Sequence, residues 1–210
     1  MEELETIKGD DGFTAKIYYD QDAQNPCRDR DYLGLIYIKR REGSKETASI
    51  RGLDEAIYDA CNCGGIALFL EACDRSGAVS VRDRLKLRYD LAECDTKLSD
   101  EDQADGADGV TWASREAIQE EFGKVTRATK DKAAKILEME IREYSQWASG
   151  EVYGIVIEDS DGNDVDSCWG FYGWDYAQEQ AKEMLQTAIE SAREDQANMA
   201  LMQSTEGAGI

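Results

Sequence analysis

The sequence contains no histidine, a single proline, and only 24 Lys and Arg residues against 45 Asp and Glu. Without histidine, the chain lacks the most common general base and the most common transition-metal ligand. The shortage of cations leaves a formal net charge of −21, and so acidic a surface is repelled by phosphate backbones and by anionic lipids. The longest uncharged run, residues 60–70, is far shorter than the about 20 residues that span a bilayer. We therefore expect neither direct nucleic-acid binding nor membrane association.

The composition nevertheless predicts a folded protein. Apolar residues make up 41% of the chain, with 4 Trp, 10 Tyr and 4 Phe, whereas disordered chains are poor in aromatic residues. The first residues, MEELET, are acidic and contain no apolar stretch of the kind found in a secretory signal. We therefore expect a soluble protein of the host-cell cytoplasm, with its six cysteines reduced.

Hydrophobic periodicity and turn residues predict an α+β fold in which antiparallel hairpins pack with several helices. The expected strands are 13–19, 33–39, 79–90, 152–158 and 165–169, and the first two are expected to pair as a hairpin. The expected helices are 53–60, 65–73, 114–122, 129–148 and a long amphipathic C-terminal helix, 175–198, while 95–109 reads as a loop. We divide the chain into an N-terminal α+β region (1–100), a helix-hairpin-helix region (101–198) packed on the first, and a flexible tail (199–210).

The negative charge is uneven along the chain. Residues 151–210 hold 13 Asp and Glu but only two cations, a net charge of −11, whereas the helix expected at 129–148 is neutral. The final helix has an apolar stripe and an acidic stripe on opposite sides. The apolar stripe consists of Ala181, Met184, Leu185, Ala188 and Ala192, and the acidic stripe consists of Glu179, Glu183, Glu190 and Glu194. These glutamates lie about 6, 10.5 and 6 Å apart along the axis. They are typical either of a face that imitates the phosphates of nucleic acid or of a face kept acidic for solubility.

A second acidic cluster lies between the last two expected strands: Asp159, Asp161, Asp164 and Asp166. Alternating oxygen ligands are typical of a calcium loop, but the sixth position is Asp164 instead of glycine and the twelfth is Gly170 instead of glutamate. We interpret the segment as a hairpin turn and include its aspartates among the candidate partner-binding residues. The cysteines at 61, 63, 73 and 94 do not have the spacing of a zinc site, and we expect no metal or other cofactor.

Five aromatic residues gather next to this hairpin: Trp169, Phe171, Tyr172, Trp174 and Tyr176. They are typical of a hydrophobic corner that locks the last helix onto a sheet. They are also typical of an anchor for a partner, because Trp and Tyr are enriched at interface hot spots. We include Trp174 as a candidate partner-binding residue.

The segments Gly150-Glu-Val-Tyr-Gly-Ile-Val-Ile-Glu and Asp166-Ser-Cys-Trp-Gly-Phe-Tyr-Gly resemble a family of small acidic proteins encoded by bacteriophages and mobile elements. Gln24-Asn25-Pro26, Leu33-Gly34 and Gly109-Val110-Thr111-Trp112 extend the resemblance over most of the chain. The family has no assigned enzymatic activity, so the resemblance implies no catalytic residues. It implies instead a biological setting, in which mobile elements must survive the defences of their host. The antirestriction and anti-CRISPR inhibitors that act in this setting are acidic, as this chain is.

The sequence thus favours a non-enzymatic anti-defence inhibitor. Its acidic surface would occupy the nucleic-acid-binding cleft of a host defence nuclease, or of another nucleic-acid-binding protein. One alternative is a phage accessory scaffold or adaptor that binds a host partner through the aromatic corner at 169–176. Another is an enzyme that uses a carboxylate-bound divalent metal. The sequence does not decide between a monomer and a homodimer, and two-fold symmetry in a homodimer would lengthen the acidic surface.

Overall fold

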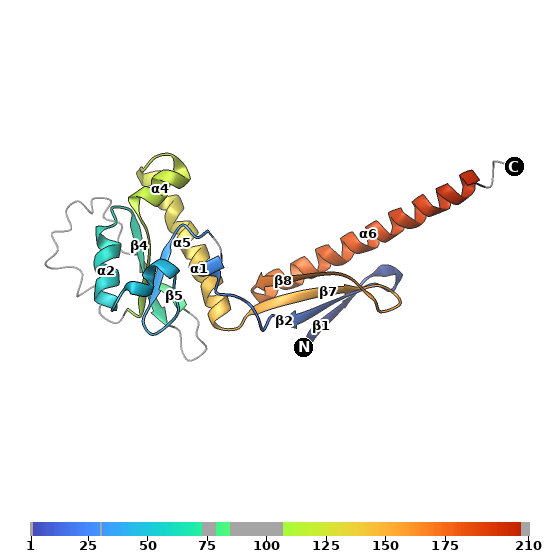
Figure 1. The fold of residues 1–210 in the computed structure, drawn as a ribbon, viewed down its shortest axis with the longest axis horizontal. Coiled ribbons are helices and arrows are strands. Elements are labelled where there is room, and N and C mark those ends of the chain that lie inside the picture. Colours follow the sequence, from blue (N-terminus) through green and yellow to red (C-terminus); the bar gives the residue numbers. More distant parts are fainter. Residues whose placement is uncertain (1, 30, 73–78, 85–106, 207–210) are drawn as a thin grey trace. The chain divides into compact units, whose positions relative to one another are not determined.

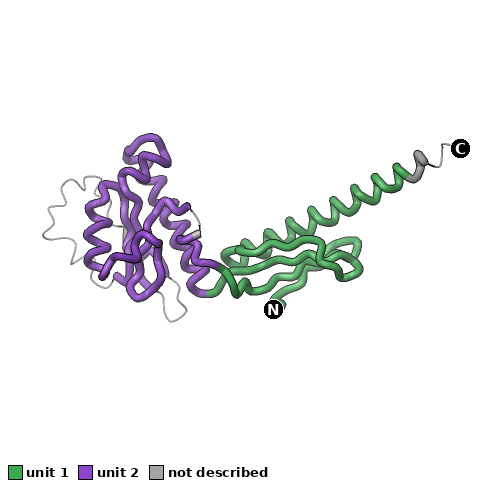
Figure 2. The backbone as a smooth tube through the Cα atoms, in the orientation of Figure 1, with its two compact units in different colours: residues 1–23, 150–210 green, residues 24–149 purple. Residues whose placement is uncertain are grey.

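The computed structural model describes residues 2–29, 31–72, 79–84 and 107–206. They form an α+β fold with two four-stranded sheets in which all paired strands are antiparallel (Figure 1). The chain divides into two compact units: residues 1–23 and 150–210 form unit 1, and residues 24–149 form unit 2 (Figure 2). The expected fold class is confirmed.

Unit 1 is a sheet with a helix on one face. Its strand order is β1 (Glu3–Lys8), β2 (Thr14–Tyr19), β7 (Val152–Glu158) and β8 (Asp164–Tyr172), and the short helix η1 (Asp10–Gly12) joins β1 to β2. The helix α6 (Trp174–Glu206) lies against this sheet (Figure 1). Alternate strand residues meet helix residues about one turn apart, and the buried set is Ala15, Ile17, Tyr153, Ile155, Ile157, Phe171, Ala177, Ala181, Leu185 and Ile189.

The final helix is longer than the sequence predicted. We expected it to end near residue 198, but α6 continues to Glu206, and every residue from Arg193 to Met202 is exposed. Residues 196–206 contain no Gly or Pro and are rich in Ala, Met and Gln, which favour helix. Residues 199–206 therefore continue the helix where the sequence predicts a tail, and 207–210 lie outside the described residues.

Unit 2 is a sheet covered on both faces. Its strand order is β3 (Leu35–Ile38), β6 (Gly109–Ala113), β4 (Ile66–Ala72) and β5 (Val79–Arg84). The helix α2 (Leu53–Asn62) packs on one face, and α4 (Arg115–Phe122) and α5 (Arg127–Ala148) pack on the other. The short helices α1 (Pro26–Asp29) and η2 (Lys45–Ser49) complete the unit.

The expected helix at 65–73 is wrong, since Ile66–Ala72 forms the strand β4. Ala67 and Phe69 pack with α2, whereas Ile66 and Leu68 pack with α4 and α5. A strand buried on both faces has a continuous apolar run, which cannot be told from a buried helix by periodicity alone.

Several local predictions are confirmed. The Ala117 N–H donates to Ser114 Oγ at the start of α4, and Gly123 ends that helix at φ 72°. The long central helix exists and begins two residues early, at Arg127, after a Thr126 cap. The final hairpin forms from β7 and β8. No helix in the described ranges is long and apolar enough to cross a membrane.

The predicted pairing of 13–19 with 33–39 is wrong. The strand β2 pairs with β1 and β7, and β3 pairs with β6. The division at residue 100 therefore differs from the structure: the β2–β7 pairing closes unit 1 across an insertion of 126 residues, 24–149. The strand β1 was not predicted. Most of the segments expected as the end of a strand (85–90) and a loop (95–109) lies outside the described residues, except that Gly109 begins β6.

Candidate partner-binding surface

The fold concentrates the negative charge in unit 1. Residues 1–23 and 150–210 hold 4 Lys and Arg against 20 Asp and Glu, a net charge of −16. Residues 24–149 hold 20 against 25, a net charge of −5. The first 23 residues carry −5 of the charge of unit 1, and the β2–β7 pairing and the packing of β2 against α6 bring them to the acidic C-terminal third.

Two of the four cations of unit 1 are neutralised within it. Lys16 Nζ lies 2.5 Å from Glu158 Oε1, and this hydrogen bond raises the pKa of the lysine. Arg193 Nε donates to Asp11 Oδ2 at 2.7 Å, with Asp10 3.7 Å from Nη2, and the bond to Asp11 raises the pKa of the guanidinium. These pairs leave the remaining carboxylates of unit 1 with little intramolecular compensation.

The α6 glutamates lie on the exposed side of the helix. Glu179, Glu183, Glu190 and Glu194 are all exposed, whereas Ala177, Ala181, Leu185 and Ile189 face the sheet. The Gln180 amide donates to Glu183 at 3.0 Å, and the Gln186 amide donates to Glu190 at 2.6 Å. These neutral partners hold the side chains while leaving their charge intact.

The aspartates of the hairpin have two different environments. Asp159 Oδ1 accepts the backbone N–H groups of Asp161 and Asn163, each at 2.9 Å, and the Asn163 amide donates to both of its oxygens. The bond from the Asn163 side chain and the backbone bonds lower the pKa of Asp159. Asp159 therefore stabilises the turn, whereas Asp161, Asp164 and Asp166 are exposed.

The aromatic corner is divided between the two faces of the sheet. Trp174 is half-buried and packs edge-on against Tyr153, with ring centroids 5.2 Å apart, on the α6 side. Trp169 stacks with Tyr18 at 6.5 Å on the opposite face, where it lies over Gly154 and remains 39% exposed. Trp174 therefore supports the core, and Trp169 is the more accessible tryptophan.

The sequence reasoning missed the N-terminal acidic residues and Asp195. The former were assigned to a different region because β1 has too few apolar residues to be recognised as a strand. Asp195 lines a groove with Asp166 and Phe13, three residues from distant parts of the chain. Asp195 follows Ser191 by four residues and Ala188 by seven, so the three side chains share one face of α6. This spacing is the only sequence signal that Asp195 lies at the groove.

The cysteines and carboxylates give no separate metal centre in the described part of the chain, where no three His, Cys, Asp or Glu side chains are arranged to hold an ion. Cys27 and Cys61 are buried, as free cysteines often are, whereas Cys63 is only partly buried. Cys73 and Cys94 lie outside the described residues.

Comparison with known proteins adds no assignment, because no family model, curated protein or solved structure matches this chain. The resemblance to acidic phage proteins therefore stays a prediction.

Proposed function

We propose that the protein is a phage-type anti-defence inhibitor of the anti-CRISPR or antirestriction class. The acidic surface of unit 1 would enter the DNA- or RNA-binding cleft of a host nuclease complex and exclude the nucleic acid. The observation that supports this proposal is the net charge of −16 on a unit with four cations, two of them paired internally. The inhibitor acts by occupying the cleft, so it needs no catalytic residue and no cofactor. Its site of action would be the host cytoplasm.

The proposed mimicry has a simple physical basis. A nucleic-acid cleft is lined by Lys and Arg that attract a dense row of phosphates. The four α6 glutamates present carboxylates on one exposed helix face, and Asp161, Asp164 and Asp166 add charge along the hairpin. Complementary charge of this kind speeds association and makes it sensitive to salt.

The test is a competition experiment with purified nucleases, including CRISPR effectors and restriction enzymes. We expect a complex that forms at low salt, weakens steeply as salt rises, and is displaced by the cognate DNA or RNA. A complex that is indifferent to both salt and nucleic acid would contradict mimicry.

Charge-neutralising variants test the surface itself. Replacing Glu179, Glu183, Glu190 and Glu194 by Gln should weaken binding and leave folding intact, since all four are exposed. The matched control replaces four exposed glutamates of unit 2, which are Glu46, Glu116, Glu120 and Glu121. Both variants remove four charges, so an equal loss of affinity would show that only the total charge matters.

A second candidate function is a phage accessory adaptor that binds a host protein through an aromatic contact. The stacked pair Trp169 and Tyr18 on the sheet face opposite α6 favours it, because Trp169 is 39% exposed there and Trp and Tyr are enriched at interface hot spots. Trp169→Ala should then abolish partner binding with little dependence on salt. The inhibitor hypothesis expects the opposite pattern, a weak effect of Trp169→Ala and a strong effect of salt.

A further inference from the structure

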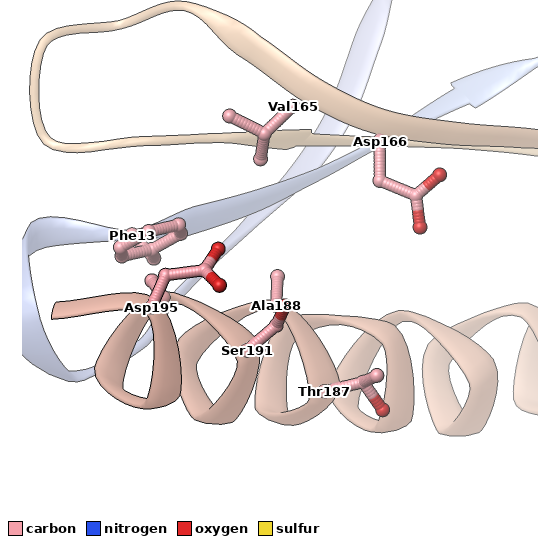
Figure 3. A pocket seen from close by; sticks show the side chains of 8 residues that line it. Phe13, Val165, Asp166, Thr187, Ala188, Ser191 and Asp195 are labelled. Atoms are coloured by element: carbon pink, nitrogen blue, oxygen red, sulfur yellow. The ribbon is translucent and has the colours of Figure 1, made fainter. Parts of the chain in front are cut away.

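A groove of about 360 Å³ runs between β8 and α6 in unit 1 (Figure 3). Phe13, Val165 and Asp166 line it on the side of the sheet. On the side of the helix it is lined by Thr187, Ala188, Ser191, Ala192 and Asp195. The small helix residues explain why α6 does not fill this space, since larger side chains there would close it.

An irregularity in β8 directs two adjacent side chains into the groove. Ile157 pairs with Asp166, but the next residue of β7, Glu158, pairs with Asp164, so Val165 is an additional residue in β8. A bulge of this kind changes the side on which a side chain lies. Val165 and Asp166 consequently both point toward α6 (Figure 3), and Val165 stays 48% exposed.

The groove combines an apolar floor with uncompensated negative charge. Phe13 and Val165 supply apolar surface, and Asp166 and Asp195 supply carboxylates from opposite walls. In the described ranges, no Lys or Arg forms an ion pair with either carboxylate, and Arg193, two residues before Asp195, pairs with Asp10 and Asp11 instead. A site of this kind fits a side chain with an apolar stem and a cationic head.

We propose that this groove receives an arginine side chain from the basic surface of the partner protein. The proposal rests on the proposed function and adds a specific contact to it. The methylene stem lies along Phe13 and Val165, and the guanidinium lies between Asp166 and Asp195. Arginine suits the site better than lysine, since its planar head is less strongly hydrated, stacks on aromatic rings and carries several N–H donors for carboxylates. A second copy of this chain is disfavoured as the occupant by the net charge of −16 on unit 1.

The test uses small probes with one side chain each and the acetyl group on the α-nitrogen. They are Nα-acetyl-arginine amide, Nα-acetyl-lysine amide and Nα-acetyl-norleucine amide. Each is titrated into the full-length ¹⁵N-labelled protein. We expect the arginine probe to shift the amides of Val165, Asp166, Ala188 and Ala192, with weaker shifts for lysine and the weakest for norleucine. Shifts spread over acidic residues throughout unit 1 would overturn the proposal.

Three variants separate the groove from general electrostatics. Asp166→Asn with Asp195→Asn should weaken arginine binding about three- to tenfold, the range for two exposed ion pairs. The control, Glu2→Gln with Glu151→Gln, removes the same charge at the opposite end of the strands and should have a smaller effect. Ala192→Met should also weaken binding, since it fills the groove without changing the charge. Equal effects of the two charge variants, or no effect of Ala192→Met, would refute the groove.

The same variants distinguish this proposal from the proposed function. If nuclease binding is lost equally in the groove variant and in the control, the inhibitor hypothesis stands and the arginine contact is wrong. If the probe binds in the groove but no nuclease is bound or inhibited, the contact stands and the inhibitor hypothesis is wrong.

Discussion

Glu140 of α5 is a carboxylate in the interior of unit 2, with only 7% of its surface exposed. Its Oε1 accepts the Leu33 N–H at 2.6 Å, and its Oε2 accepts the Gly34 N–H at 3.1 Å. Burial raises the pKa of Glu140 to about 7, with a smaller contribution from the charge of Glu143, while the two backbone donors oppose the shift. Ionisation of Glu140 is thus less favourable in the folded protein than in the unfolded chain.

This pKa predicts how stability depends on pH. The unfolded value is 4.5, so the contribution of the protonated group is complete below pH 4.5 and is lost as the pH rises through about 7. A shift from 4.5 to about 7 corresponds to about 3 kcal/mol, of which about 2 kcal/mol is lost between pH 5.5 and 8. The chain has no histidine, so no other side chain with an ordinary pKa titrates across this range.

The assay is urea unfolding between pH 5.5 and 8, with the wild type compared with Glu140→Gln. We expect the wild type to lose about 2 kcal/mol more than Glu140→Gln over this range, because the amide cannot ionise. Glu120→Gln on the exposed side of α4 is the control and should follow the wild type. The amide resonances of Leu33 and Gly34 should titrate with a midpoint near 7 in the wild type and in Glu120→Gln, but not in Glu140→Gln. Parallel stability curves for the wild type and Glu140→Gln would refute the reasoning.

Three further predictions concern the fold. Gly154→Ala should destabilise unit 1 by about 1–3 kcal/mol, because the new Cβ would lie 1.9 Å from the Trp169 ring. Chemical unfolding followed by tryptophan fluorescence measures the loss, and an unchanged midpoint would contradict it. Replacing residues 24–149 by a short Asn-Gly turn should leave unit 1 folded, because the Asp20 N–H already donates to Val152 O at 2.8 Å and holds the two chain ends together. Circular dichroism tests this, and the absence of a cooperative thermal transition would contradict it. Burial raises the pKa of the Cys27 thiol to about 11, so iodoacetamide at pH 8 should not modify Cys27 in the folded protein. The exposed Cys168 should be modified under the same conditions, and peptide mass spectrometry distinguishes the two sites.

The elements that the sequence predicts correctly carry their signals locally. Ser114 and Gly123 bracket α4 because a helix end needs an oxygen acceptor at its start and a residue tolerant of positive φ at its finish. The turn at Asp161-Gly162 joins β7 to β8 because Gly162 adopts φ 81° at low cost. Each of these depends on residues within one or two turns of chain, so neighbouring positions suffice to predict it.

The errors arise where the deciding contact is distant in sequence. Whether Ile66–Ala72 is a strand depends on being covered by α2 on one face and by α4 and α5 on the other. The partner of β2 is β7, more than 130 residues away, and no local pattern distinguishes it from β3. The groove at Asp166 and Asp195 is likewise assembled from β8, α6 and the segment before β2.

The sequence by itself determines the total charge of −21 and the acidic final third, since both are counts along the chain. It also determines the exposed row of α6 glutamates, because helix periodicity sets one face against the other. Only the tertiary structure places the acidic N-terminal 23 residues beside that final third and assigns residues 24–149, with a net charge of −5, to the other unit. The physical reason is the hydrogen-bonded pairing of β2 with β7, which converts a charge gradient along the chain into a unit with a net charge of −16.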